Sequence, residues 1–312
     1  MKAIARLLPL LVLSACASRT MPTPVGPQRA PQAFQQFNRA SHSSVRRFNA
    51  ATSQKKFPYG LGADVRGLPP MNGGASSFST QANLPAKVDL RSEMSPIYNQ
   101  GQTNACVGYS TVGGLGEYIA RKRGWNMRFS PRYLWNLGRK RIKTVDQNTG
   151  MYLEDAIKVI DNLGMLPAAD YPMLSTDPGQ TDLFQRNLTQ LPTNAQIAKA
   201  KKFRISQGWK RIPSVHSMRK ALSEGKPVVF AMMIHDNMSE AVNGVIPMPT
   251  ATSQPVGGHA IVAVGYDNAR RHFIIRNSWG TSWGDKGYGY LPYDYFRNDV
   301  KNLSIYAGFT IK

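Results

Sequence analysis

The segment 106–123 constrains the fold of this chain most, because a predicted helix there begins at the only cysteine outside the first sixteen residues. Val107 and Leu115 recur at roughly helical spacing, and Gly124 is suited to end the helix. A thiol at a helix N-terminus faces unpaired N–H groups and the positive end of the helix dipole, and both favour the thiolate. The sequence therefore predicts a helix that presents a nucleophilic sulfur at its first turn.

Four glycines interrupt this predicted helix, at positions 108, 113, 114 and 116. Glycine in a helix interior costs about 1 kcal/mol relative to alanine. So many glycines in one helix therefore predict that another element packs closely against it.

Two further motifs lie far downstream of the cysteine. His259 opens an apolar strand predicted over 259–266, and a second predicted strand, 273–276, ends on Asn277. A cysteine alone is more often a small buried apolar residue than a nucleophile. Cysteine, histidine and asparagine in this order are, however, the residues of a cysteine-hydrolase triad, so the three together favour catalysis.

The chain resembles the papain-like cysteine proteases over residues 86–312. The main matches are Asn99-Gln100-Gly101 with Cys106, Gly258-His259-Ala260, and Asn277-Ser278-Trp279-Gly280 with Trp283-Gly284. Weaker matches are Val88-Asp89-Leu90-Arg91 and Asp170-Tyr171-Pro172. The chain departs from the family pattern at Thr103, where a disulfide cysteine is common, and at Val107, where a tryptophan is usual.

The resemblance implies an α+β fold of two lobes with the active-site cleft between them. The helical left lobe, at about 86–190, would contain the nucleophile helix, and the right lobe, at about 191–312, would be antiparallel and β-barrel-like. Apart from the nucleophile helix, the apolar spacing predicts helices at 131–140, 152–163, 195–202 and 214–225, a strand at 228–234, and a polar loop at 173–195.

The resemblance also implies the roles of the site residues. Cys106 would be the nucleophile, His259 the acid and base, and Asn277 the group that orients the imidazole. Gln100 and the backbone N–H of Cys106 would stabilise the oxyanion of the transition state, and Cys106 and His259 would rest as a thiolate–imidazolium pair. Substrate-binding residues are expected at Gly150, Met151, Gly258 and Trp279. No cofactor is expected, and no metal site either, because the other histidines have no partners at ligand spacing.

The first fifteen residues are typical of a secretory signal peptide. Lys2 and Arg6 precede an apolar run, 7–13, far shorter than the roughly 20 residues that cross a membrane. The run ends in Leu13-Ser14-Ala15-Cys16, which resembles the bacterial lipoprotein processing box, so Cys16 is predicted to be lipidated. The alternative is an ordinary signal cut nearby. We expect an exported lipoprotein of the outer membrane or facing the periplasm, or else a secreted protein.

Residues 16–85 are rich in Pro, Ala, Ser, Gln and Arg and contain a single acidic residue, Asp64. This composition favours a largely disordered tether between the lipid and the peptidase domain. The alternative is a pro-segment that inhibits the enzyme. In that case residues 56–70 are the part expected to lie in the cleft.

The formal net charge of +21 suggests attraction to anionic lipid surfaces, although charge that only keeps the chain soluble is the alternative. Nucleic acid is not expected as a partner, because no binding motif is present. The predicted function is a membrane-anchored, monomeric cysteine-type endopeptidase that acts on peptides or proteins through a thioester acyl-enzyme. The alternatives are a catalytically inactive peptide-binding scaffold and an acyl transferase that uses the same thioester.

Overall fold

The structure is a computed structural model that describes residues 57–66, 69–71, 84–205, 208–296, 305 and 308–311. All of these belong to one unit of the chain, Lys55–Lys312. The predicted signal peptide, the lipidated Cys16 and most of the predicted tether lie outside the described residues. Among the described helices, none is long and apolar enough to cross a membrane.

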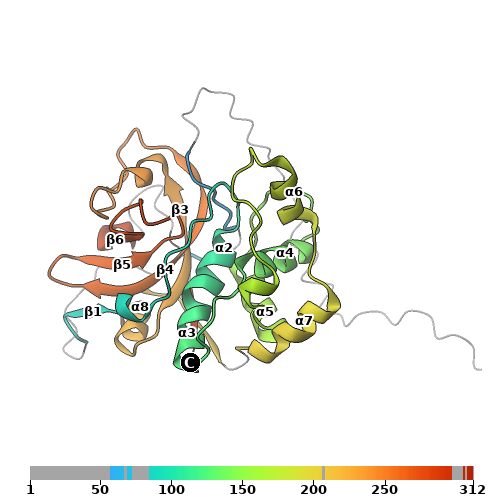
Figure 1. Ribbon diagram of the computed structural model, residues 1–312. Coiled ribbons are helices and arrows are strands. Elements are labelled where there is room, and N and C mark those ends of the chain that lie inside the picture. The colour runs from blue at the N-terminus through green and yellow to red at the C-terminus, as the bar shows by residue number, and fades with distance from the viewer. Residues whose placement is uncertain are drawn as a thin grey trace, which may run out of the picture. The chain divides into compact units, whose positions relative to one another are not determined.

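An antiparallel sheet forms one side of this unit (Figure 1). Its strands follow the order β2-β7-β3-β4-β5-β6, and β1 pairs with β4 outside this path. The centre of the sheet is core, because β3 and most of β4 are apolar and buried. The strands are β1 (Lys87–Asp89), β2 (Trp209–Ile212), β3 (Val228–His235), β4 (Pro255–Asp267), β5 (His272–Arg276), β6 (Tyr288–Pro292) and β7 (Gly308–Ile311).

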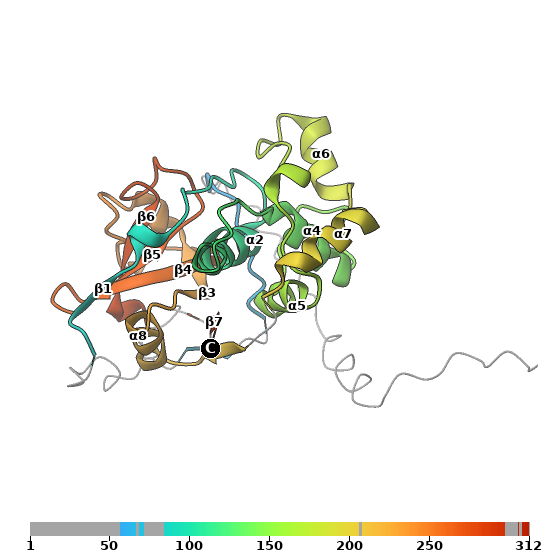
Figure 2. The same ribbon diagram turned by 60° about the horizontal axis from the view of Figure 1, so that its bottom comes forward.

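Helices α4 to α7 lie on the other side, and the helix that begins at Cys106 runs between them and the sheet (Figures 1 and 2). α8 packs against β2, β3 and β4. The helices are α2 (Cys106–Gly108), α3 (Glu117–Lys122), α4 (Pro131–Arg141), α5 (Leu153–Leu163), α6 (Thr181–Thr189), α7 (Asn194–Ala200) and α8 (Val215–Ser223). This arrangement confirms the predicted α+β fold with a helical and a β lobe.

The predicted nucleophile helix is present, but its middle, Tyr109–Gly116, is a π-helix that links α2 to α3. The close packing predicted from its glycines is also present. A side chain on Gly114 would begin 2.5 Å from Val262 of β4, so the helix can approach the sheet this closely only with glycine there. The helix ends at Lys122, and Gly124 adopts a φ of 77° just beyond it.

The predicted helices α4, α5, α7 and α8 and the predicted strands β3, β4 and β5 are confirmed. α8 begins with a capping box between Ser214 and Ser217. The loop predicted at 173–195 is wrong, because it contains α6. Only Phe184, Asn187 and Leu188 of α6 are buried, and so few apolar residues leave little helical periodicity to detect.

Two elements cross the predicted division of the lobes near residue 190. β1 belongs to the sheet through its pairing with β4, although it precedes the helices in the chain. α7 follows residue 190 but packs against α5. Each lobe therefore contains a piece of chain from the other half of the sequence, which apolar spacing alone does not reveal.

Candidate active site

His259 and Asn277 come together because β4 and β5 are antiparallel neighbours. His259 Nε2 lies 2.9 Å from Asn277 Oδ1, and the same oxygen accepts the N–H of Ser278 at 2.8 Å. His259 is fully buried and Asn277 is 3% exposed. The ring of Trp279 stacks on the imidazole with centroids 4.6 Å apart. The structure thus assembles the predicted histidine–asparagine pair beneath a tryptophan.

Cys106 is the first residue of α2, which packs against β4. The backbone amide of Ala260, the residue after His259, lies against the sulfur and favours its thiolate. The packing of α2 on β4 therefore brings the Cys106 sulfur next to the part of β4 that carries His259. No hydrogen bond reaches Nδ1 of His259 from the described part of the chain.

Burial determines the protonation of both groups in this form. It raises the pKa of the Cys106 thiol to about 12, against the opposing effect of backbone amides from Ala260 and Ala63. It lowers the pKa of His259 to about 4, against the opposing bond from Asn277. Burial therefore favours the neutral thiol and the neutral imidazole. The expected thiolate–imidazolium pair is not favoured here, because charged groups without water around them are strongly destabilised.

Gln100 is fully buried beside these groups. Its Nε2 donates to the backbone oxygens of Gly60 at 2.9 Å and Thr103 at 2.8 Å, and its Oε1 accepts from the hydroxyl of Ser278 at 2.6 Å. The hydroxyl of Thr103 donates to the backbone oxygen of Gln100 at 2.8 Å. Thr103, which stands where a disulfide cysteine is common, thus stabilises this loop by a hydrogen bond.

Residues 57–66, which we call the strap, pass directly over this site and appear in blue near α2 in Figure 1. Gly60 N donates to Gly101 O at 2.9 Å, and Gly62 N and Ala63 N both donate to Gly258 O at 3.0 Å. On the other side, Met151 N donates to Gly62 O at 3.0 Å. The strap therefore bridges the β4 side and the helical side across Cys106.

All four predicted substrate-binding residues contact the strap. Met151 and Gly258 bond to its backbone, as above. The oxygen of Gly62 lies 1.8 Å from the point where a side chain on Gly150 would begin, so that contact requires glycine. The fourth residue, Trp279, stacks on Tyr59 with ring centroids 4.4 Å apart. The surface predicted to bind substrate is thus occupied by the chain's own N-terminal segment.

Two asparagines that the sequence did not single out hold the strap from the helical side. Asn104 Oδ1 accepts the N–H of Leu61 at 3.1 Å, and Asn148 Oδ1 accepts the N–H of Asn104 at 2.9 Å. A side chain on Gly62 would begin 2.1 Å from the backbone oxygen of Asn104, and Gly62 has a φ of 141°. In the sequence, the two glycines at 60 and 62, separated by one residue, indicate an extended segment that packs closely against its neighbours.

No group of three or more His, Cys, Asp or Glu side chains that could hold a metal ion is found within the described ranges.

A family model described as papain family cysteine protease matches residues 84–306. The chain belongs to this family. Among solved structures, it is similar to xylellain, a cysteine protease from Xylella fastidiosa, with a TM-score of 0.66 and 27% identity. That match covers 84% of this chain and 98% of xylellain.

Curated relatives give the same picture for this papain-family chain. It is 28% identical over 242 residues to an uncharacterized peptidase C1-like protein of Acanthamoeba polyphaga mimivirus, covering 72% of this chain and 76% of the viral protein. It is 27% identical over 239 residues to cathepsin K of Mus musculus, covering 73% of this chain and 65% of cathepsin K.

Proposed function

We propose that this protein is a cysteine-type endopeptidase in which Cys106, His259, Asn277 and Gln100 act as predicted from the sequence. The observation that supports this most is the 2.9 Å contact between His259 Nε2 and Asn277 Oδ1 beside the helix that begins at Cys106. That contact leaves Nδ1 as the ring nitrogen for proton exchange with the thiol. Peptides or proteins are the proposed substrates.

In the proposed reaction, the proton of the Cys106 thiol passes to Nδ1 of His259 as the sulfur attacks the scissile carbonyl. The backbone N–H of Cys106 and the side-chain amide of Gln100 donate to the oxyanion, a type of contact whose loss costs about 2.7–4 kcal/mol. The C–N bond breaks, the amine leaves with the proton from His259, and a thioester remains. Water activated by His259 then cleaves the thioester, releases the acid and restores the thiol.

We further propose that the form described here is latent. The donor that would stabilise the oxyanion, Gln100 Nε2, is already bonded to Gly60 O, and Tyr59 covers Trp279. A substrate cannot reach either group until the strap leaves. For residues 57–66 this favours the pro-segment alternative over a free tether. Removal of the strap would readmit water, bring the pKa values of Cys106 and His259 closer together, and permit the ion pair.

Peptide-library digestion by the full chain and by Cys106→Ala tests the proposed activity. Hydrolysis that disappears in the variant, with unchanged thermal unfolding, supports it. Hydrolysis that persists in the variant contradicts it. Intact binding of peptides without any cleavage would favour the inactive scaffold, and products joined to an added amine would favour acyl transfer.

Export and lipidation of Cys16 stay proposals, since that residue lies outside the described part of the chain. An acylated cysteine would anchor the peptidase to a membrane, with about 0.8 kcal/mol for each buried CH₂. Cys16→Ala should release the protein from the membrane fraction or leave it unprocessed. A variant that remains membrane-bound and fully matured contradicts the lipoprotein assignment. Attraction to anionic lipid, also proposed, should weaken with salt.

A further inference from the structure

Arg276 is the last residue of β5 and directly precedes Asn277, yet its side chain has no place in the mechanism above. It is 4% exposed, and burial lowers its pKa. A buried charge is costly unless hydrogen bonds and opposite charges compensate it. The groups that bond to this guanidinium therefore show which segments of the chain it connects.

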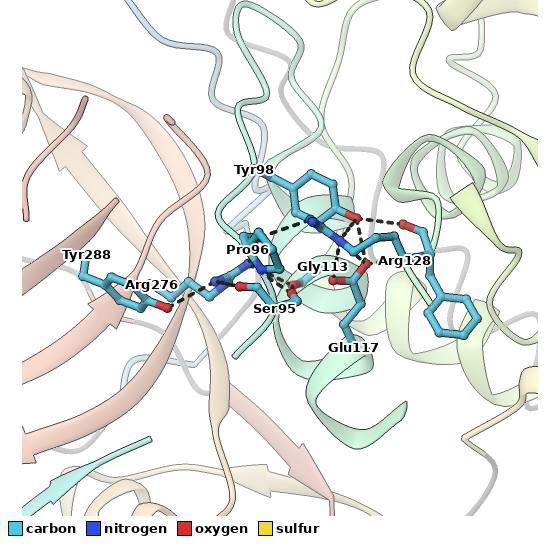
Figure 3. Close-up of polar contacts among 9 residues, drawn as sticks. Ser95, Pro96, Tyr98, Gly113, Glu117, Arg128, Arg276 and Tyr288 are labelled. Carbon is cyan, nitrogen blue, oxygen red and sulfur yellow. Dashed lines mark hydrogen bonds and ion pairs between the residues drawn. The ribbon is translucent and has the colours of Figure 1, made fainter. Parts of the chain in front are cut away.

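The guanidinium of Arg276 points from the strand toward a loop and the nucleophile helix (Figure 3). It donates to the backbone oxygens of Ser95 at 2.7 Å, Pro96 at 2.8 Å and Gly113 at 3.3 Å. Within the described residues, no carboxylate lies within ion-pair distance of it. Its charge is thus balanced mainly by backbone oxygens of two other segments.

Those two segments carry the other proposed catalytic groups. Gly113 belongs to the helix that begins at Cys106, and the Ser95–Pro96 loop leads to Gln100. The hydroxyl of Ser95 adds a bond to Gly113 O at 3.1 Å. Arg276 therefore joins its own strand to two other segments, and all three must stay in register for the site to work.

A second buried charge supports the same loop from the helical side. Glu117, at the start of α3, accepts the hydroxyl of Tyr98 at 2.7 Å and the N–H of Phe129 at 2.8 Å. It also forms an ion pair with Arg128 at 3.0 Å. Because Tyr98 lies two residues before Gln100, this cluster and Arg276 hold the loop from opposite sides (Figure 3).

Asn277 depends on such support. Its Oδ1 is bonded to His259 and Ser278, but its Nδ2 has no hydrogen-bond partner among the described residues. The orientation of the amide is therefore set largely by the backbone of residues 276–278. That backbone bonds from Asn277 N to Gly287 O at 3.0 Å and accepts Gln100 N at Ser278 O at 2.8 Å, and the side chain of Arg276 adds its bonds to the loop and the nucleophile helix.

We propose that Arg276 is a positioning residue of the active site. It fixes the strand that bears Asn277 against the nucleophile helix and the Gln100 loop, and so keeps Asn277, with the imidazole that it orients, in register with Cys106. This inference rests on the proposed peptidase function.

Arg276→Lys in the full chain tests the inference, because lysine keeps the charge but loses the planar fork of donors. Displacements of about 1 Å in an active site can cost about 100-fold in rate, so we expect kcat to fall about 10- to 100-fold, with KM changed by less than about 3-fold. The matched control is Arg132→Lys. Arg132 is also buried and donates to backbone oxygens, those of Pro172 at 3.0 Å and Asn187 at 3.4 Å, but it does so within the helical lobe.

The pH profile of Cys106 alkylation by iodoacetamide gives a second readout, which a merely structural role would not move. We expect Arg276→Lys to shift this profile and Arg132→Lys to leave it at the parent position. Ser95→Ala removes the bond to Gly113 O and should also lower kcat. This variant replaces Arg276→Lys in the test if Arg276→Lys does not fold. The inference is overturned if Arg276→Lys has the kcat of the parent and an unshifted alkylation profile. If Arg276→Lys does not fold, the same result in Ser95→Ala overturns it.

The two proposals fail in different ways. If hydrolysis by the parent does not depend on Cys106, the peptidase function is wrong, and the alkylation profile alone still decides whether Arg276 positions the thiol. If hydrolysis depends on Cys106 but Arg276→Lys behaves as Arg132→Lys does, only the positioning role is wrong.

Discussion

The ring of Tyr59 stacks on the indole of Trp279 with centroids 4.4 Å apart and an angle of 4° between the planes. Trp279 in turn stacks on His259, so one continuous stack joins the strap to the imidazole. The strap thus covers the same tryptophan that shields the His259–Asn277 bond. The latency proposed here depends on contacts of this kind.

Tyr59→Ala should weaken the strap and speed hydrolysis by the full chain. Aromatic pairs contribute about 0.5–1.5 kcal/mol beyond area burial, which corresponds to about a 2- to 10-fold increase in the open fraction. Initial rates on one peptide substrate measure the effect. Phe203→Ala is a matched control, since Phe203 packs edge-on against Trp125 at 5.3 Å outside the strap. Equal rates for parent and Tyr59→Ala contradict a covering role for the ring.

Gln100→Ala should lower kcat about 100- to 1,000-fold, because it removes a proposed oxyanion donor. The same change also removes a bond to the strap, so the open fraction should rise and the net loss should lie near the lower end. Gln185→Ala, in an exposed position of α6, is the control and should keep the parent kcat. A Gln100→Ala enzyme with parent kcat shows that this amide does not stabilise the transition state.

Latency should be strongest between about pH 6.5 and 9. The covered form keeps His259 neutral down to a pKa of about 4, whereas an uncovered imidazole takes up its proton near pH 6.5. Acidification from about pH 6.5 toward pH 4 therefore favours release of the strap. Above about pH 9 the uncovered thiol ionises while the covered thiol does not, which favours release again.

Hydrogen exchange of peptides spanning 57–66, normalised to intrinsic exchange rates, measures this pH dependence. We expect exchange to accelerate between pH 7.5 and 5, with 228–234 of β3 as the internal reference. His259→Asn should lose the acidic limb. Asp64 does not account for that limb, since bonds from Arg66 lower its pKa despite the opposing effect of burial. Constant normalised exchange across the window contradicts the linkage.

Sequence reasoning identified the groups whose chemistry is local and missed those defined by contacts between distant segments. Cys106 is recognisable from a helix start, and His259 from the apolar run that follows it, although β4 itself already begins at Pro255. Met151, one of the predicted substrate-binding residues, bonds to the extended backbone of the strap, and its role toward substrate stays a prediction. By contrast, the bond of Arg276 to Gly113 O joins segments 163 residues apart, which no local pattern encodes.

Residues 16–85 are a second case. Their composition indicates a tether, whereas contacts such as the close fit of Gly62 against Asn104 show that residues 57–66 have a fixed binding place. The sequence pattern does not predict α6. Its short apolar face, with Phe184 and Leu188, is too small to stand out in a polar stretch.

The most direct test of the account compares hydrolysis and Cys106 alkylation in the full chain and in Gly62→Ala. The added methyl group would lie 2.1 Å from Asn104 O and should expel the strap. Gly124→Ala is the matched control, because Gly124 also has positive φ but no neighbour within 4 Å of the added group. We predict that Gly62→Ala speeds both reactions at least about tenfold, the equivalent of 1.4 kcal/mol, while Gly124→Ala leaves both unchanged. Rates in Gly62→Ala equal to those of the parent would contradict a latent peptidase covered by its own strap.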